Sequence, residues 1–411
     1  MKAALRTFLL LLAPGLLVLL GGLASLLRTG QVDPRGWMAP ALLLIPAAAL
    51  IGRRRREGAV WWIGLGTVGM VLSCLFLAAW RVPALVPLTW LLAVVLLAVI
   101  AGLMLRAPAT AGAGRVAGAG LALLAVAMCW LARDPPVQPA THLPKMAVIT
   151  GLPLFWRGVA KVDAPIITVL RQRFDVRPLD SPLALETSGA RTLLLAQPRA
   201  FSMAELVALN AWISRGGRAL LLADPELHWP MELPLGDRRR PPAITLLGAM
   251  IEYWGVKLMP PAAGEKRHFL GDGRVLTLYA ASGFKDAGPD CRIIGRGLVA
   301  RCGVGKGSVT MVADADLVDD RLWLADPAAP VEPEQWTADT PQFIADALGA
   351  TLPAGRRWVR SGDALVTAVR WAVIVGIFWA ALGTVLFRPY RKAPSAPSSP
   401  QFDQPTLLKD G

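Results

Sequence analysis

The chain has 411 residues, of which 54% are hydrophobic, and it carries a net charge of +14. Its mean hydropathy of +0.48 is above that of a typical soluble globular protein, which excludes an ordinary soluble enzyme or binding domain. Residues 1–134 hold 12 Lys or Arg against 3 Asp or Glu, and this excess lies beside apolar stretches, so it indicates membrane orientation and excludes a nucleic-acid partner.

The N-terminal third, residues 1–134, contains five apolar stretches with the length of membrane spans. They cover residues 5–27, 37–52, 59–80, 85–105 and 116–132. The first is too long for a typical signal-peptide core, so we favour a retained anchor over a cleaved signal. The second is short and holds Pro40 and Pro46, so we expect it to be kinked and supported by its neighbours. These features predict a membrane block of about five helices.

Basic loops predict how the chain is oriented in the membrane. Four consecutive arginines, residues 53–56, separate the second and third spans and favour a cytoplasmic loop. The fifth span then leaves the membrane on the outer side at Asp134. Residues 364–387 form a sixth span, followed by Arg388, Arg391 and Lys392 and by a Pro/Ser-rich tail, residues 388–411, that should be disordered. We therefore expect a bacterial inner-membrane protein, in contact with lipid, with both termini cytoplasmic and its main domain periplasmic.

A proline-rich linker, residues 135–145, leads to a predicted α/β domain over residues 146–355. Ser202-Met203-Ala204-Glu205 fits a helix capping box, Gly216 or Gly217 can end that helix, and a wholly apolar run follows as a buried strand. Further buried strands are expected at residues 146–151, 176–179, 192–196 and 308–313, with helices at 163–174, 243–254 and 340–349. Asp163 is the expected cap of the first of these helices. Antiparallel strands are expected at 275–279, 292–294 and 298–301. This alternation predicts a doubly wound sheet.

Acidic residues follow two of the predicted strands at their carboxyl ends, where α/β folds place their sites. Asp224, Asp314 and Asp316, together with the nearby His228, are the candidate ligand-binding residues. The alternative, which we favour, is that these acids satisfy backbone amides in turns. Gly303–Ser308 precedes a strand and lacks the spacing of a phosphate loop, so we interpret it as a glycine-rich turn. No metal, cofactor or catalytic residue is expected.

Two of the four cysteines, Cys291 and Cys302, flank a segment that can fold as a hairpin about Gly295-Arg296-Gly297. Such a hairpin would bring the two cysteines opposite each other, and we predict a disulfide if the domain lies in an oxidising compartment. The alternative is a nucleophilic Cys302 with a histidine base. No nucleophile elbow surrounds Cys302, so the disulfide is favoured.

Two motifs carry a resemblance to a known family. The stretch from Trp212 to Pro225 (WISRGGRALLLADP) resembles the helix–Gly-Gly–strand–Asp-Pro core of auxiliary membrane proteins of gliding-motility-type ABC transport systems. The stretch from Gly305 to Asp316 (GKGSVTMVADAD) is similar to a later strand of that family. The resemblance implies a glutamine-amidotransferase-like domain without catalytic residues, working beside an ABC ATPase and a permease. This chain departs from the family in having about five N-terminal spans where one is common.

These features predict a non-enzymatic membrane accessory component of an ABC-type transport or envelope system, with a periplasmic interaction domain. Two alternatives remain open. One is a periplasmic hydrolase or amidotransferase-like enzyme, and the other is a stand-alone scaffold or ligand-sensing receptor.

Overall fold

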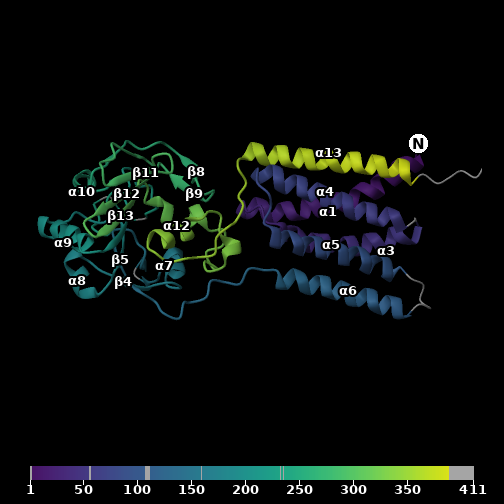
Figure 1. Ribbon diagram of the computed structural model, residues 1–411, viewed down its shortest axis with the longest axis horizontal. Coiled ribbons are helices and arrows are strands. Elements are labelled where there is room, and N and C mark those ends of the chain that lie inside the picture. Colours follow the sequence, from purple (N-terminus) through teal and green to yellow (C-terminus); the bar gives the residue numbers. More distant parts are fainter. Residues whose placement is uncertain are drawn as a thin grey trace, which may run out of the picture.

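A computed structural model describes residues 2–54, 57–106, 112–158, 160–231, 233–234 and 236–387. The chain forms a bundle of long helices and a separate α/β domain, placed end to end (Figure 1). Arg55 and Arg56, the basic residues after Phe387 and the tail predicted to be disordered lie outside the described residues.

Among the described residues, five helices are long and apolar enough to cross a membrane: α1 (Lys2–Thr29), α4 (Glu57–Ala79), α5 (Leu85–Leu105), α6 (Gly112–Leu131) and α13 (Gly362–Leu386). The predicted second span is broken, as expected, with a bend of 43° between the two parts. It comprises η1 (Pro34–Trp37), α2 (Met38–Ala41) and α3 (Leu44–Arg54). Pro46 contributes to the break because it has no N–H to donate to the preceding turn.

The last span, α13, lies at the edge of the bundle and packs against α4, although about 300 residues separate the two helices in sequence (Figure 1). The rings of Trp62 and Trp379 stack with centroids 4.1 Å apart. Each indole N–H donates to the backbone carbonyl of the other tryptophan, at 3.0 and 2.8 Å. Gly66 lies under the Trp379 ring, where any added Cβ would collide with it. Small residues that allow such close approach are typical of helix contacts in membranes.

The α/β domain is built on a seven-stranded sheet in the order β11-β12-β13-β6-β5-β1-β4. The strands are β1 (Lys145–Thr150), β4 (Asp175–Pro178), β5 (Thr192–Ala196), β6 (Arg218–Leu222), β11 (Cys291–Ile294), β12 (Val299–Val304) and β13 (Gly307–Val312). The five strands from β13 to β4 are parallel, while β11 and β12 extend the sheet as antiparallel strands. The parallel part has the 2-1-3-4-5 order of flavodoxin-like doubly wound sheets. The prediction of a parallel-sheet α/β domain is therefore confirmed.

Helices cover both faces of this sheet (Figure 1). On the face away from the bundle, α8 (Leu185–Ser188), α9 (Met203–Ser214) and α10 (Gly248–Tyr253) enclose one apolar core. On the face toward the bundle, α7 (Pro165–Leu170), α12 (Thr340–Ala347) and a hairpin of β8 (Glu265–Phe269) and β9 (Val275–Tyr279) enclose the other. The shorter elements are β2 (Trp156–Arg157), β3 (Ala160–Lys161), η2 (Pro182–Ala184), β7 (Lys257–Leu258), β10 (Phe284–Lys285), η3 (Asp316–Val318), α11 (Asp320–Trp323) and η4 (Pro333–Gln335).

The predicted helix start and stop around α9 are confirmed. Ser202 and Glu205 form the complete capping box, and Gly216 has a φ of +117° just after the helix. The cap predicted at Asp163 is wrong. Ala164 precedes α7 without any side-chain cap, and the Asp163 carboxylate instead accepts from Nε of Arg171 at 2.5 Å.

Two predicted helices are shorter in the structure. Arg171 is already the C-cap of α7, so that helix does not reach residue 174. The helix expected from residue 243 begins only at Gly248. The backbone before it is engaged elsewhere, because Ala243 accepts from Leu227 N–H and Thr245 donates to the Asp224 carbonyl.

Backbone and side-chain hydrogen bonds tie the bundle to the α/β domain. The N–H of Val32 donates to the Arg357 carbonyl at 2.7 Å, and that of Val359 donates to Gly30 at 2.9 Å. The buried amide of Gln31 donates to the carbonyls of Pro333 and Trp336, at 2.9 and 2.6 Å. The two parts are therefore joined by hydrogen bonds as well as by the covalent connections between them.

Candidate functional site

The sequence-predicted acids meet at the carboxyl edge of the sheet. Asp224 and Asp314 each follow their strands, β6 and β13, by two residues, and these strands are parallel neighbours. Asp224, Asp314 and Asp316 are all buried, and each offers an oxygen atom within 4.8 Å of the others. We call these three residues the acidic triad.

Most of the triad oxygens already accept hydrogen bonds from backbone amides. The Asp224 carboxylate accepts from the N–H groups of Glu226 and Ala315, at 2.8 and 2.9 Å. Asp314 accepts from Tyr279 and Leu317, both at 3.0 Å. Asp316 accepts through Oδ2 from His228 at 2.8 Å, whereas its Oδ1 has no partner among the described residues. This pattern supports the interpretation that the acids order the loops at the sheet edge.

Burial and mutual repulsion disfavour ionisation of the triad. Burial, then the charges of Asp224 and Asp316, raises the pKa of Asp314 well above its usual range. Burial above all, together with the Asp224 charge, raises the pKa of Asp316 to about 7, and burial also raises that of Asp224. The all-oxygen donor set has the chemistry that a hard cation such as Ca²⁺ or Mg²⁺ prefers. Five of its six oxygens are occupied by amides, however, so the expectation of no metal stays our prediction.

His228 contributes its backbone and not its ring to the triad. Its ring lies edge-on to that of Tyr279, with centroids 4.9 Å apart, and its Nε2 is 3.3 Å from Oε1 of Glu226. Only its backbone N–H reaches Asp316. The described geometry thus provides no general base directed at the carboxylates.

Gln197, which was not singled out from the sequence, lies at the position where doubly wound folds usually bind ligands. It follows β5 beside β1, where the strand order reverses. Its fully buried amide donates to the carbonyls of Asp224 and Pro242, at 3.1 and 3.0 Å, and accepts from the Asp224 N–H at 3.0 Å. A Cβ added at Gly151 would lie 2.5 Å from the Gln197 carbonyl. The side chain that follows β5 at the switch point is therefore engaged by the loops around Asp224 and Pro242. The only sequence signal for this role was the position of Gln197 directly after a buried strand.

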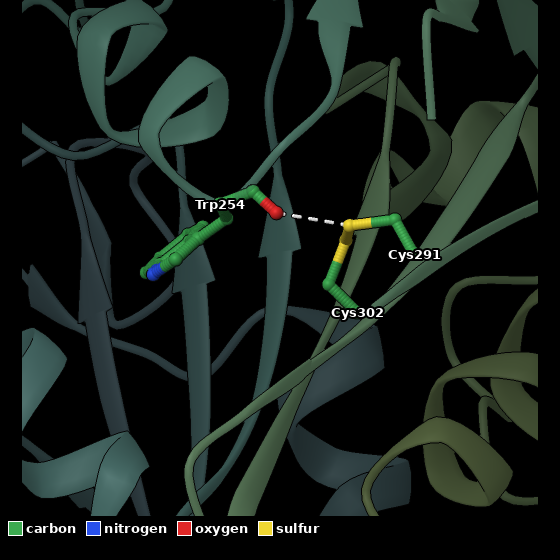
Figure 2. Close-up of a disulfide and its surroundings, with 3 residues drawn as sticks. All are labelled: Trp254, Cys291 and Cys302. Atoms are coloured by element: carbon green, nitrogen blue, oxygen red, sulfur yellow. Dashed lines mark hydrogen bonds between the residues drawn. A yellow bond between two sulfur atoms is a disulfide. The ribbon is translucent and has the colours of Figure 1, made fainter. Parts of the chain in front are cut away.

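Cys291 and Cys302 lie directly opposite each other in the β11–β12 hairpin and form a disulfide (Figure 2). Their Cα atoms are 4.1 Å apart. Sγ of Cys291 lies 2.9 Å from the carbonyl oxygen of Trp254, at the end of α10. A sulfur atom in this bond is no nucleophile, so the arrangement favours a structural role for Cys302. The following turn, Gly303–Ser308, joins β12 to β13 as a hairpin with Gly305 at a φ of +60°, as expected of a glycine-rich turn.

We expect two reactive thiols per chain, those of Cys74 and Cys129, when the full protein is unfolded without reductant and labelled with a maleimide. Reduction should raise the number to four. The bridge closes a loop with a sequence separation of 11 residues, and for a loop of this size chain entropy gives about 2–3 kcal/mol of stabilisation. The free energy of unfolding of a Cys291→Ser/Cys302→Ser chain should be lower than that of the wild type by about that amount. Four thiols in the unreduced sample would refute the bridge.

The comparisons with known proteins concern the α/β domain. The family model described as "ABC-type uncharacterized transport system", an auxiliary family, matches residues 143–269. The resemblance found in the sequence is thereby confirmed for a stretch that runs from β1 to β8 and includes Asp224 and His228. A search among curated proteins finds no match.

Solved structures similar to the chain give no functional guidance. They include the exo-β-1,4-mannosidase Op5Man5 from Opitutaceae bacterium strain TAV5, with 15% identity and a TM-score of 0.29 over 56% of this chain and 39% of that one. A cytoplasmic protein from Salmonella typhimurium LT2 has 11% identity and a TM-score of 0.29 over 42% of this chain and 89% of that one. A β-galactosidase from Rahnella sp. R3 has 14% identity and a TM-score of 0.28 over 59% of this chain and 38% of that one. At these TM-scores no shared activity follows.

Proposed function

We propose that this chain is a non-enzymatic integral membrane component of an ABC-type transport or envelope system. Its α/β domain would be the extracytoplasmic part that contacts a partner or ligand. The observation that carries the proposal is the match of residues 143–269 to an auxiliary family of ABC-type transport systems. The long apolar helices, and the hydrogen bonds that tie them to the domain, support a role at the membrane.

The chemistry of the sheet edge supports a binding role over a catalytic one. An enzyme of the hydrolase or amidotransferase type needs a nucleophile with a base in reach of it. Here Cys302 is held in a disulfide, and the triad oxygens are mostly engaged by backbone amides. We propose that the domain has a glutamine-amidotransferase-like fold that serves recognition, an assignment supported by its parallel sheet.

The partners we propose are an ABC ATPase and a permease. Affinity-tagged full chain should be extracted from its own membranes in mild detergent, with an unrelated tagged six-span protein as the control. Peptide mass spectrometry should find both partners enriched with this chain and not with the control. Recovery of the chain without any ATPase would favour the stand-alone scaffold or receptor.

We further propose that the α/β domain is periplasmic and that both termini are cytoplasmic. The connections at residues 30–33, 80–84 and 132–144 lie at the end of the bundle that faces the domain, and the N-terminus and the end of α13 lie at the other (Figure 1). Alkaline phosphatase fused after Asp134 should be active, and a fluorescent reporter fused after Lys392 should fold in the cytoplasm. An inactive phosphatase after Asp134 would reverse the orientation, and it would remove the oxidising compartment that the disulfide requires.

A further inference from the structure

A basic cavity lies where the helical bundle meets the α/β domain. It has a volume of about 510 Å³ and is lined from four directions: the end of α4, the β8–β9 hairpin, the tip of the β11–β12 hairpin and the connection that leads into α13. We call it the junction pocket. Its size falls within the usual range of small-molecule sites.

The lining of the junction pocket is strongly positive. Seven lining residues are basic, and no Asp or Glu is among them. The basic residues are Arg81, Lys266, Arg267, Arg296, Arg356, Arg357 and Arg360. Of these seven residues, only Arg356 lies within ion-pair range of a carboxylate in the described part of the chain, at 3.8 Å from that of Asp134. Carboxylates outside the lining, those of Asp339, Glu265 and Asp134, offset part of this charge. The positive excess that remains around one cavity favours an anionic occupant.

Buried donors of the pocket also lack partners. Nη2 of Arg267 and Nη1 of Arg356 are buried and have no hydrogen-bond partner in the described structure. The Arg356 side chain is only 9% exposed, and burial lowers the pKa of both arginines. A guanidinium nevertheless stays protonated in proteins, so the missing acceptors are costly. Nε2 of His268 is likewise buried without a partner.

The position of the pocket brings it to the depth of lipid headgroups if the bundle spans the membrane as proposed. Ala79, which lines the pocket, is the last residue of α4, and Arg360 lies two residues before α13. Arg81 reaches from the bundle to the domain, where its guanidinium packs on Gly273 in the β8–β9 turn. An anion bound here would contact both parts of the molecule.

We propose that the junction pocket binds a phosphate group and thereby links the bundle to the α/β domain. Guanidinium groups match phosphate oxygens in a bidentate geometry, which suits a site lined mainly by arginines. The phosphate is that of an anionic lipid headgroup in the adjacent leaflet or of a soluble phosphorylated molecule. The site does not depend on the transport role proposed above.

The test measures thermal unfolding of the full chain in mild detergent while a phosphate source is titrated in. One arm compares phosphatidylglycerol with phosphatidylcholine, and the other compares sodium phosphate with sodium chloride at equal ionic strength. The pocket variant is Arg81→Gln/Arg296→Gln, and its matched control is Arg191→Gln/Arg292→Gln. All four arginines are exposed, and the control pair lies outside the pocket, so both variants should fold.

Phosphatidylglycerol or phosphate should stabilise the wild-type chain and the control to the same degree. The pocket variant should need about 30-fold more of the same anion to reach the same stabilisation, because each charge removed near a membrane surface weakens binding roughly 5-fold. A response only to phosphatidylglycerol identifies a lipid headgroup, and a response to inorganic phosphate identifies a soluble ligand. The proposal is overturned if neither anion stabilises the wild type, or if the pocket variant responds like the control.

Discussion

Replacing Asp339 with alanine is expected to lower the free energy of unfolding by about 3–5 kcal/mol, a loss typical of breaking a buried polar network. Asp339 is 3% exposed, and its Oδ2 accepts from the backbone N–H of Val275 at 2.8 Å and from the indole N–H of Trp358 at 2.6 Å. Alanine leaves both donors buried without a partner, at about 1–3 kcal/mol each. Because the residue links α12, the β8–β9 hairpin and the connection to α13, its loss should loosen the contact between domain and bundle.

The measurement is the unfolding midpoint of the full chain in mild detergent, followed by tryptophan fluorescence. Asp339→Asn keeps an oxygen acceptor and should lose only about 1–2 kcal/mol. Asp290→Ala is the matched control, because Asp290 is exposed and its side chain has no partner in the described structure. If Asp339→Ala unfolds at the same midpoint as the control, Asp339 does not hold these segments together.

Replacing Asp316 with asparagine is expected to stabilise the protein at pH 8 and to change little at pH 4. Burial and the Asp224 charge raise the pKa of Asp316 from 3.8 to about 7. The unfolded chain therefore releases this proton near pH 4 and the folded chain only near pH 7. Between these values the native state binds more protons, so stability falls as the pH rises. A pKa shift of this size lowers the free energy of unfolding of the wild type at pH 8 by about 4 kcal/mol, relative to a protein with an uncharged group at this position.

An asparagine in this place keeps an oxygen for the His228 N–H and carries no charge. The difference in unfolding midpoint between Asp316→Asn and wild type should grow from pH 4 to pH 8, whereas Asp290→Asn should show no such trend. Addition of Ca²⁺ or Mg²⁺ should leave the wild-type midpoint unchanged. A wild type that divalent cations stabilise, combined with a variant that is less stable at pH 8, would instead indicate a metal site.

Local signals predicted much of the α/β domain. The capping box at Ser202, the left-handed Gly216 and the apolar run that follows are decided within a few residues, so the helix–strand unit could be predicted from sequence. The positions of Asp224 and Asp314 at the carboxyl ends of their strands were also predicted. That these two strands are parallel neighbours, which brings the acids together, came only from the structure.

Contacts between distant segments were not predictable in this way. Tyr279 reaches Asp314 from a separate hairpin, and the buried amide of Gln197 bonds to the loop at Pro242. The junction pocket gathers residues from four segments, such as Arg81 and Arg356, whose charges look like ordinary span-flanking residues in the sequence. Only the packing of the domain on the bundle brings them together.

The most direct test of the central claim, membership in an ABC-type assembly, is the native mass of the tagged full chain released from its own membrane. The chain alone contributes 43.8 kDa. We predict a complex whose mass equals this chain plus an ATPase and a permease in whole-number ratios, and which loses those subunits together on dissociation. A mass equal to one chain, or to a multiple of 43.8 kDa alone, would contradict the proposed function.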